Sequence, residues 1–271
     1  MNRKSTAERA KILQLLVEGN SLRATSRIAD CSINTVYKLF ADAGEACNWY
    51  QDQVLRNLTC QRIEVDEIWS FVYARRQNVR PDMEVPAGDI WTWTALCPDT
   101  KLMVSWYIGN RDRAAAEQFM LDLCQRFQNR IQLTSDGMPA YKDAVDNAFG
   151  SEVDFAMLVK QYSIPKGKQL SGPYTGAIQE RRIGNPDMSK ARTTFVERHN
   201  LTMRTNIKRF TRRTNAHSKK IENHAYAVAL HCMYYNFVRI HSSLKVTPAM
   251  AAGVTNKLWS LQDLVDMIDS Y

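Results

Sequence analysis

The hydrophobic pattern of the chain changes near Gln61, and this change restricts the folds that the chain can adopt. Before it, apolar residues recur at helical spacing. Residues 62–76, RIEVDEIWSFVYARR, are instead rich in β-branched and aromatic side chains, which is typical of a strand. Two further runs of this kind, IWTWTALCP and KLMVSWYIG, are separated only by Asp99 and Thr100 and predict a hairpin. A meander of three strands is therefore expected to follow a helical N-terminal segment.

The rest of the chain alternates between helical and strand patterns. We expect the elements after the meander at these positions: a helix at 111–127, a strand at 131–137, a helix at 139–149, a strand at 152–163, an irregular loop at 164–192 and a helix at 195–210. This order matches the ribonuclease H-like arrangement, a mixed sheet with helices on its faces. The predicted fold class is therefore α/β, a ribonuclease H-like mixed sheet with flanking helices, preceded by a small all-α domain.

That all-α domain consists of three helical segments. The first covers residues 5–18, Ser21 caps the second, and Ser32 caps a third that is expected to end at Gly44. A leading helix followed by two short helices with a tight turn between them is typical of a helix-turn-helix. Its exposed candidates for DNA contact are Asn34, Thr35, Tyr37 and Lys38. A three-helix bundle that binds no nucleic acid is the alternative.

These patterns divide the chain into four expected parts. They are a helix-turn-helix DNA-binding domain at 1–45, a linker at 46–60, a catalytic domain at 61–253 and a C-terminal helix at 254–271. Within the last two parts, Pro248 is expected to start a helix, and LWSLQDLVDMI has the apolar pattern of another.

Composition excludes several classes of protein. No run of about 18 apolar residues is present, so no membrane span is expected. The polar N-terminus, MNRKSTAERAKILQ, lacks the apolar core of a signal peptide and predicts an intracellular protein. The six cysteines are scattered without a CxxC pair, which argues against a zinc finger and favours buried thiols.

Positive charge is concentrated in one part of the chain. The segment from Arg181 to Lys220 contains twelve cationic side chains and two acids, a net charge of +10 that exceeds the +8 of the whole chain. A solvated surface usually mixes both signs, so this segment favours a phosphate-bearing partner. One of its two acids, Glu197, lies in the first turn of an expected helix and is surrounded by cations.

Two other acids, Asp66 and Asp136, lie in strand patterns. Asp66 is in the middle of the first expected strand, where a bound divalent cation would compensate its charge. Asp136 ends a strand, and the carboxyl ends of strands are where α/β sheets place their ligand sites. Together with Glu197 they form a candidate catalytic and metal-binding triad. Three carboxylates suit Mg²⁺ or Mn²⁺, and a pair of such ions can drive an in-line attack on a phosphate.

Each acid also has a structural explanation. Asp66 could be an edge-strand charge, with its neighbour Glu67 as the ligand instead. Asp136 could be a turn residue because Asp-Gly is a common turn pair, and Glu197 could be a first-turn acid that answers the helix dipole. The remaining acids near these strands are interpreted as surface or loop residues: Glu64, Asp82, Glu84 and Asp89.

Arg204 follows Glu197 by seven residues, which is two helical turns, so both are expected on one face of a helix. Lys208 extends that face, and both cations are candidates to hold a phosphate beside the reacting one. The cations that follow are expected to track the DNA backbone: Arg209, Arg212 and Arg213.

Four motifs carry a resemblance to a known family: VDEIWSFV at 65–72, SDG at 135–137, VERHNLTMRTNIKRFTRRT at 196–214 and YNFVRIHSSLKVTPAMAAG at 235–253. In this order they resemble DDE transposases of bacterial insertion sequences, most of all the insertion-sequence-one family. The resemblance implies a ribonuclease H-like core, with Asp66, Asp136 and Glu197 as metal ligands and Arg204 as the basic residue after the glutamate. Members of that family often carry a cysteine zinc motif before the helix-turn-helix, and this chain has none.

The expected function is therefore DNA transposition in the bacterial cytoplasm, with the protein on the nucleoid when it binds DNA. Its partners would be the terminal repeats of the element, the target DNA and at least one further copy of the chain. Two alternatives are open: a DNA-binding regulator whose core is structural, and a nuclease of the same fold that cuts without joining.

Overall fold

The structure is a computed structural model that describes residues 3–80, 82–83, 87–163 and 172–271. The chain forms two compact units. The sheet unit consists of Asn57–Glu67 and Thr92–His199, and the helical unit consists of Met1–Arg56, Ile68–Trp91 and Asn200–Tyr271. Strands β1 and β2 and helix α6 each have residues in both units.

The central element of the sheet unit is a six-stranded sheet with the order β3-β2-β1-β4-β5-β6. Its strands are β1 (Arg62–Val72), β2 (Gly88–Leu96), β3 (Met103–Gly109), β4 (Ile131–Asp136), β5 (Val153–Tyr162) and β6 (Tyr174–Ile183). β4 lies parallel to both β1 and β5, whereas β6 is antiparallel to β5. The expected ribonuclease H-like mixed sheet is therefore confirmed, with β6 added at its edge.

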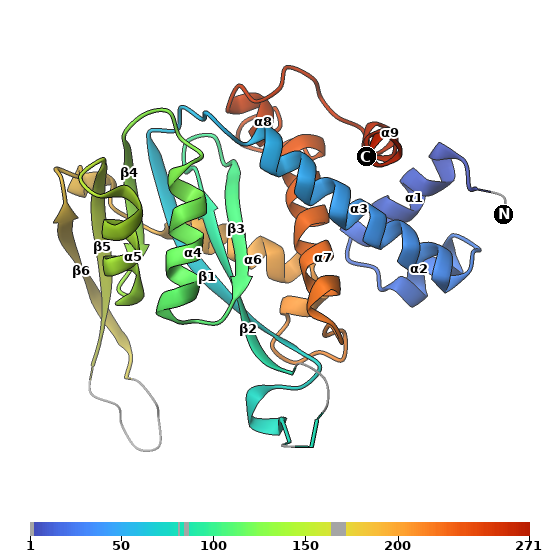
Figure 1. Ribbon diagram of the computed structural model, residues 1–271, viewed down its shortest axis with the longest axis horizontal. Coiled ribbons are helices and arrows are strands. Elements are labelled where there is room, and N and C mark those ends of the chain that lie inside the picture. The colour runs from blue at the N-terminus through green and yellow to red at the C-terminus, as the bar shows by residue number, and fades with distance from the viewer. Residues whose placement is uncertain (1–2, 81, 84–86, 164–171) are drawn as a thin grey trace. The chain divides into compact units, whose positions relative to one another are not determined.

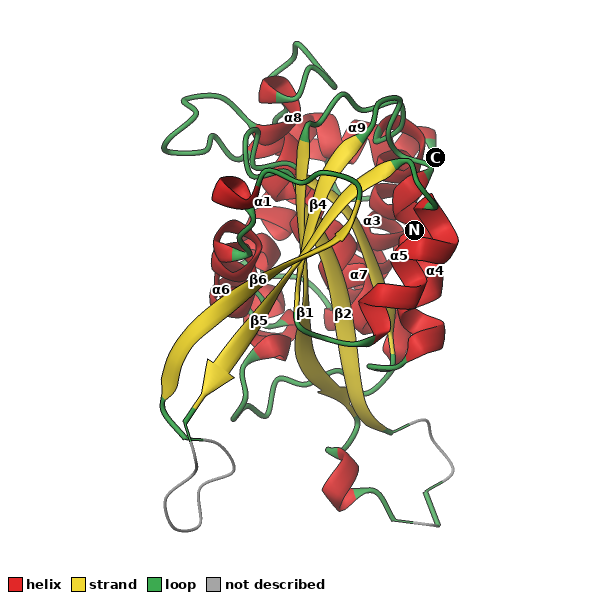
Figure 2. Cartoon of the chain, turned by 90° about the vertical axis from the view of Figure 1, so that its left-hand side faces the viewer, coloured by secondary structure: helices red, strands yellow, loops and turns green. Residues whose placement is uncertain are grey.

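Helices cover both faces of this sheet. α4 (Arg113–Cys124) and α5 (Ala140–Phe149) lie side by side on one face (Figure 1). Figure 2 shows α6 (Thr194–Asn206) on the opposite face. The core under α4 and α5 contains the buried rings of Trp93, Phe119 and Tyr141. The ring centroid of Trp93 lies 5.4 Å from that of Tyr141 and 6.0 Å from that of Phe119.

Strand β6 corrects the irregular loop expected at 164–192. Residues 164–171 lie outside the described residues, but Tyr174–Ile183 pairs with β5 from Phe155 to Tyr162. The strand was missed because its side chains, YTGAIQERRI, are mostly exposed and show no apolar alternation. Its backbone hydrogen bonds to β5, rather than burial of a face, hold it in the sheet.

The helical unit contains α1 (Thr6–Val17), α2 (Leu22–Ile28), α3 (Ile33–Val54), α7 (Ile221–Met233), α8 (Pro248–Ala251) and α9 (Leu261–Ser270). α3 packs along α7, and α1 packs against α9 (Figure 1). The capping residues Ser5, Ser21 and Ser32 each accept a backbone N–H at the start of α1, α2 and α3. The expected N-terminal helices and the Pro248 helix start are confirmed. No helix among the described residues is long and apolar enough to cross a membrane.

The predicted helix end at Gly44 is wrong, because α3 continues without a break to Val54. A Cβ atom at Gly44 would lie 2.4 Å from the Cβ of Tyr226 on α7. The glycine therefore permits the close approach of two helices instead of ending one of them. Because α3 runs through positions 45 and 46, it joins the expected helix-turn-helix to the expected linker. The four-part domain division stays a prediction.

Candidate active site

Asp66 and Asp136 lie on neighbouring parallel strands. The last residues paired between these strands are Glu64 of β1 and Thr134 of β4, and Asp66 and Asp136 each lie two residues beyond that pair. Neighbouring strands are about 4.8 Å apart. One carboxylate oxygen from each of Asp66, Glu67 and Asp136 lies within 4.8 Å of the other two. The structure thus brings together two of the three predicted acids, and adds Glu67.

Glu67 occupies a different environment from Asp66, because Glu67 is buried and Asp66 is half-buried. Its side chain is only 2% exposed. One oxygen accepts hydrogen bonds from the Arg111 guanidinium, 2.7 Å from Nε, and the other accepts the Tyr141 hydroxyl at 3.1 Å. Burial raises the pKa of Glu67, the charge of Asp136 raises it further, and Arg111 and Tyr141 oppose this shift. Glu67 is therefore held in place by partners on both oxygens.

Glu197 does not belong to this acidic group among the residues that the structure describes. It lies in the first turn of α6, where its Oε1 accepts hydrogen bonds from the Lys160 ammonium at 2.6 Å and the Thr193 hydroxyl at 2.8 Å. Burial lowers the pKa of Lys160, but the hydrogen bond to Glu197 and the charges of Glu197 and Asp66 outweigh it and raise the pKa overall. One lysine therefore interacts with two of the predicted triad acids.

A buried acid on β1 attaches the start of α6 to the sheet. Glu64 is 3% exposed, and its Oε2 accepts the backbone N–H groups of Phe195 at 2.7 Å and Val196 at 3.0 Å. These amides in the first turn of a helix have no partner within the helix. Glu64 thus holds the residue next to Glu197, and it lies two residues before Asp66 on the same face of β1. The interpretation of Glu64 as a surface or loop acid is wrong.

The donor atoms of this region fit a hard divalent cation. The grouped ligand atoms are all carboxylate oxygens, and the group includes no histidine or cysteine within the described part of the chain. Oxygen-only sites of this kind select Mg²⁺, Mn²⁺ or Ca²⁺ over Zn²⁺. The negative charge of Asp136 is strong enough to raise the pKa of Glu67, and a bound cation would offset that repulsion.

Comparison with known proteins gives two sequence matches. Residues 176–238 match the family model described as IS1 transposase. The protein InsB of insertion element iso-IS1n from Shigella dysenteriae is 30% identical over 161 residues, which cover 59% of this chain and 86% of that protein. The chain belongs to the IS1 transposase family. The resemblance of its four sequence motifs to this family is therefore confirmed.

Solved structures of the Mos1 transposase also match this IS1-family chain, at low similarity. The paired-end complex with the left transposon end has a TM-score of 0.26 and 13% identity, covering 57% of this chain and 60% of that one. The paired-end complex with Mn has a TM-score of 0.24 and 15% identity, covering 56% and 60%. The chain thus spans about three fifths of the length of these Mos1 chains.

The predicted DNA-binding residues of this IS1-family chain lie mainly on exposed surface. Asn34 and Lys38 of α3 are exposed, and Thr35 is half-buried. Arg212 and Arg213 are exposed, Arg209 is half-buried, and Arg204 lies in the last turn of α6.

The prediction that Lys208 continues the α6 face is wrong. The helix ends at Asn206, the buried Ile207 is extended, and Lys208 starts a separate 3-10 turn, Lys208–Phe210. Ile207 and Phe210, on either side of Lys208 and Arg209, are both buried.

Four residues near the acids were missed by sequence analysis: Glu64, Arg111, Tyr141 and Lys160. Each acts through a partner far away in sequence, so no local spacing identifies it. The one available signal was a charged residue inside a strand pattern, which Glu64 and Lys160 share with Asp66.

Replacement of Glu64 tests whether it anchors α6. Burial raises the pKa of Glu64 to about 7, so a large part of the carboxyl is uncharged near neutral pH, and a glutamine oxygen can accept the same two N–H groups. We expect Glu64→Gln to keep the thermal stability of the wild type. Glu64→Leu should lose about 2–4 kcal/mol, because two buried N–H groups lose their acceptor. Denaturant unfolding of both variants is the measurement, and equal losses would contradict the anchoring role.

Proposed function

We propose that this chain is a DNA transposase that binds the ends of its insertion sequence and catalyses metal-dependent strand cleavage and strand transfer. The observation that carries the proposal is the juxtaposition of Asp66 and Asp136 on adjacent parallel strands, with ligand atoms within 4.8 Å. Membership of the IS1 transposase family supports it. The attachment of α6 to β1 through Glu64, beside Glu197, supports the third position of the triad.

The proposed metal ligands are Asp66, Asp136 and Glu197, and the ions are Mg²⁺ or Mn²⁺, most simply a pair. When bound, such ions activate the attacking oxygen and stabilise the leaving oxygen of the phosphate. Asp66 and Asp136 supply carboxylates from rigid strands. Glu197 would join them by exchanging its bond to Lys160, and the released ammonium would then be available to a DNA phosphate. Glu67, held by Arg111 and Tyr141, positions the β1 backbone beneath Asp66.

We propose two sets of DNA contacts in the helical unit, one on α3 and one from the last turn of α6 onward. Asn34, Thr35 and Lys38 would approach base edges from α3, as the second helix of a helix-turn-helix at 1–45. The set that would contact backbone phosphates is Arg204, Lys208, Arg209, Arg212 and Arg213. The partners are the terminal repeats, the target DNA and a second copy of the chain, since two ends must be held together. The setting is the bacterial cytoplasm, on the nucleoid.

The test is an assay with labelled duplexes that carry the terminal repeats of the element. The proposal predicts cleaved 3′ ends and joined products with Mg²⁺ or Mn²⁺. Both should disappear with a chelator and return when excess metal is added. Cleavage without joining would indicate the nuclease alternative. Specific binding without metal-dependent cleavage would indicate the regulator, and either result would overturn the transposase proposal.

A further inference from the structure

A pocket of about 400 Å³ lies within the helical unit, among the ends of α1 and α6, the helices α2, α3 and α7, and the residues that follow α6. Its lining includes four cations, Arg23, Lys208, Arg209 and Lys219, and no acid. None of the four forms an ion pair with any residue that the structure describes. Most charged residues on a protein surface have neighbours of opposite sign, so an all-cationic lining indicates an anionic ligand.

Two contacts hold the Arg209 side chain in this pocket. Its guanidinium lies 5.4 Å from the ring centroid of Phe40 and donates one hydrogen bond to the Ser218 hydroxyl. Burial lowers the pKa of Arg209 to about 10, which leaves it charged at neutral pH. A guanidinium has five N–H donors. A half-buried charge with one neutral acceptor is costly, and an anion that accepts further donors would offset that cost.

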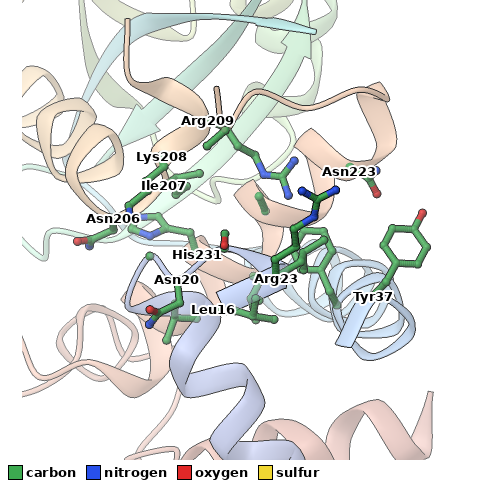
Figure 3. Close-up of a pocket in the computed structure, with 18 of the residues that line it drawn as sticks. Leu16, Asn20, Arg23, Tyr37, Asn206, Ile207, Lys208, Arg209, Asn223 and His231 are labelled. Atoms are coloured by element: carbon green, nitrogen blue, oxygen red, sulfur yellow. The ribbon is translucent and has the colours of Figure 1, made fainter. Parts of the chain in front are cut away.

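Arg23 enters the same space from α2. Figure 3 shows the guanidinium ends of Arg23 and Arg209 directed to the same part of the pocket, on the side of Tyr37 and Asn223. Two like charges directed to one place repel each other unless an anion lies between them. Paired guanidiniums match the geometry of a phosphate, whose oxygens accept several N–H donors at once.

We propose that this pocket binds one phosphodiester of a DNA strand. The phosphate would contact Arg23 and Arg209, and the attached sugar would pack against the apolar lining that includes Phe40. The volume lies near the lower end of the range for ligand sites, about 300–1,000 Å³, and so suits a nucleotide unit better than a lone ion. DNA as the source of the phosphate rests on the proposed function. The pocket joins the predicted helix-turn-helix, through Arg23, to the basic segment, through Arg209.

The test measures the affinity of the wild type, Arg23→Gln and Arg209→Gln for a terminal-repeat duplex. Fluorescence anisotropy at several salt concentrations gives the affinity and its salt dependence. Each variant should bind about 10-fold more weakly, and its salt dependence should fall by about one phosphate contact. The control is Arg27→Gln, which removes an exposed arginine of the same helix outside the pocket lining and should keep the wild-type slope. Arg23 is itself exposed, so its variant carries the test if Arg209→Gln fails to fold.

A second measurement separates this proposal from the proposed function. Thymidine 3′,5′-bisphosphate should raise the thermal stability of the wild type and not that of Arg209→Gln. Duplex binding by the wild type with unchanged slopes in both variants would overturn the pocket proposal and leave the transposase proposal standing. Stabilisation by the bisphosphate without duplex binding would support a phosphate site and overturn DNA as its source. The absence of both effects would overturn the pocket and the proposed DNA binding together.

Discussion

The Asp136→Asn variant should bind terminal-repeat DNA as the wild type does, yet cleave and join it at least about 100-fold more slowly. Loss of a residue that only supports a metal ligand typically costs 10- to 100-fold in metal affinity or activity, so loss of a ligand should cost at least as much. Asparagine keeps the size of the side chain and can still accept the Met138 N–H that the Oδ1 atom of Asp136 accepts. The turn into α5 should therefore survive, and only the charge is lost.

Asp66→Asn should behave in the same way, because carboxylate oxygens of Asp66 and Asp136 lie within 4.8 Å of each other. The measurements are cleavage and joining rates, duplex affinity and Mn²⁺ affinity by calorimetry. The control is Asp146→Asn, the same chemical change on the exposed surface of α5, which should alter none of these quantities. Rates within a few-fold of the wild type for either active-site variant would remove that residue from the proposed triad.

The course of β1 and β4 was predictable from sequence, because both strands have patterns that require burial on a sheet. The placement of Asp66 and Asp136 on them followed from that pattern alone. Their proximity did not, since it depends on the parallel pairing of strands about 70 residues apart. The order of the elements favours such a pairing but does not determine which residues stand opposite each other.

Other parts of the site depend on contacts that no sequence period carries. Glu64 resembles a solvent-facing charge in the pattern RIEVDEI, yet it is buried because two amides of α6 need its carboxyl. Lys160 lies near the exposed end of β5 and acquires its role from Glu197, 37 residues later. Helix α6 ends at Asn206, although the local sequence predicted a helix to Phe210. For Glu64 and Lys160, a tertiary contact decided the outcome.

The acidic group contains Glu67 as its third member, whereas the proposed triad contains Glu197. The environments of these two acids predict which of them is the third metal ligand. Glu67 is almost fully buried, and both of its oxygens already accept hydrogen bonds. The Glu197 side chain is 40% exposed, and its ion pair with Lys160 is of the exposed kind that is worth about 1 kcal/mol or less. An incoming divalent cation can displace that lysine far more readily than it can displace Arg111 and Tyr141 from Glu67.

We therefore expect Glu197→Gln to weaken Mn²⁺ binding at least about 10-fold and to slow cleavage about 100-fold, with little change in thermal stability. Glu67→Gln should instead lower stability by about 1–3 kcal/mol, because Arg111 loses a charged partner, and weaken Mn²⁺ binding less. Lys160→Met, which removes the competing ammonium, should tighten Mn²⁺ binding. Calorimetric Mn²⁺ titration and thermal unfolding of the three variants separate these effects. If Glu67→Gln abolishes Mn²⁺ binding while Glu197→Gln preserves it, the third ligand is Glu67, and Glu197 is a first-turn acid paired with Lys160.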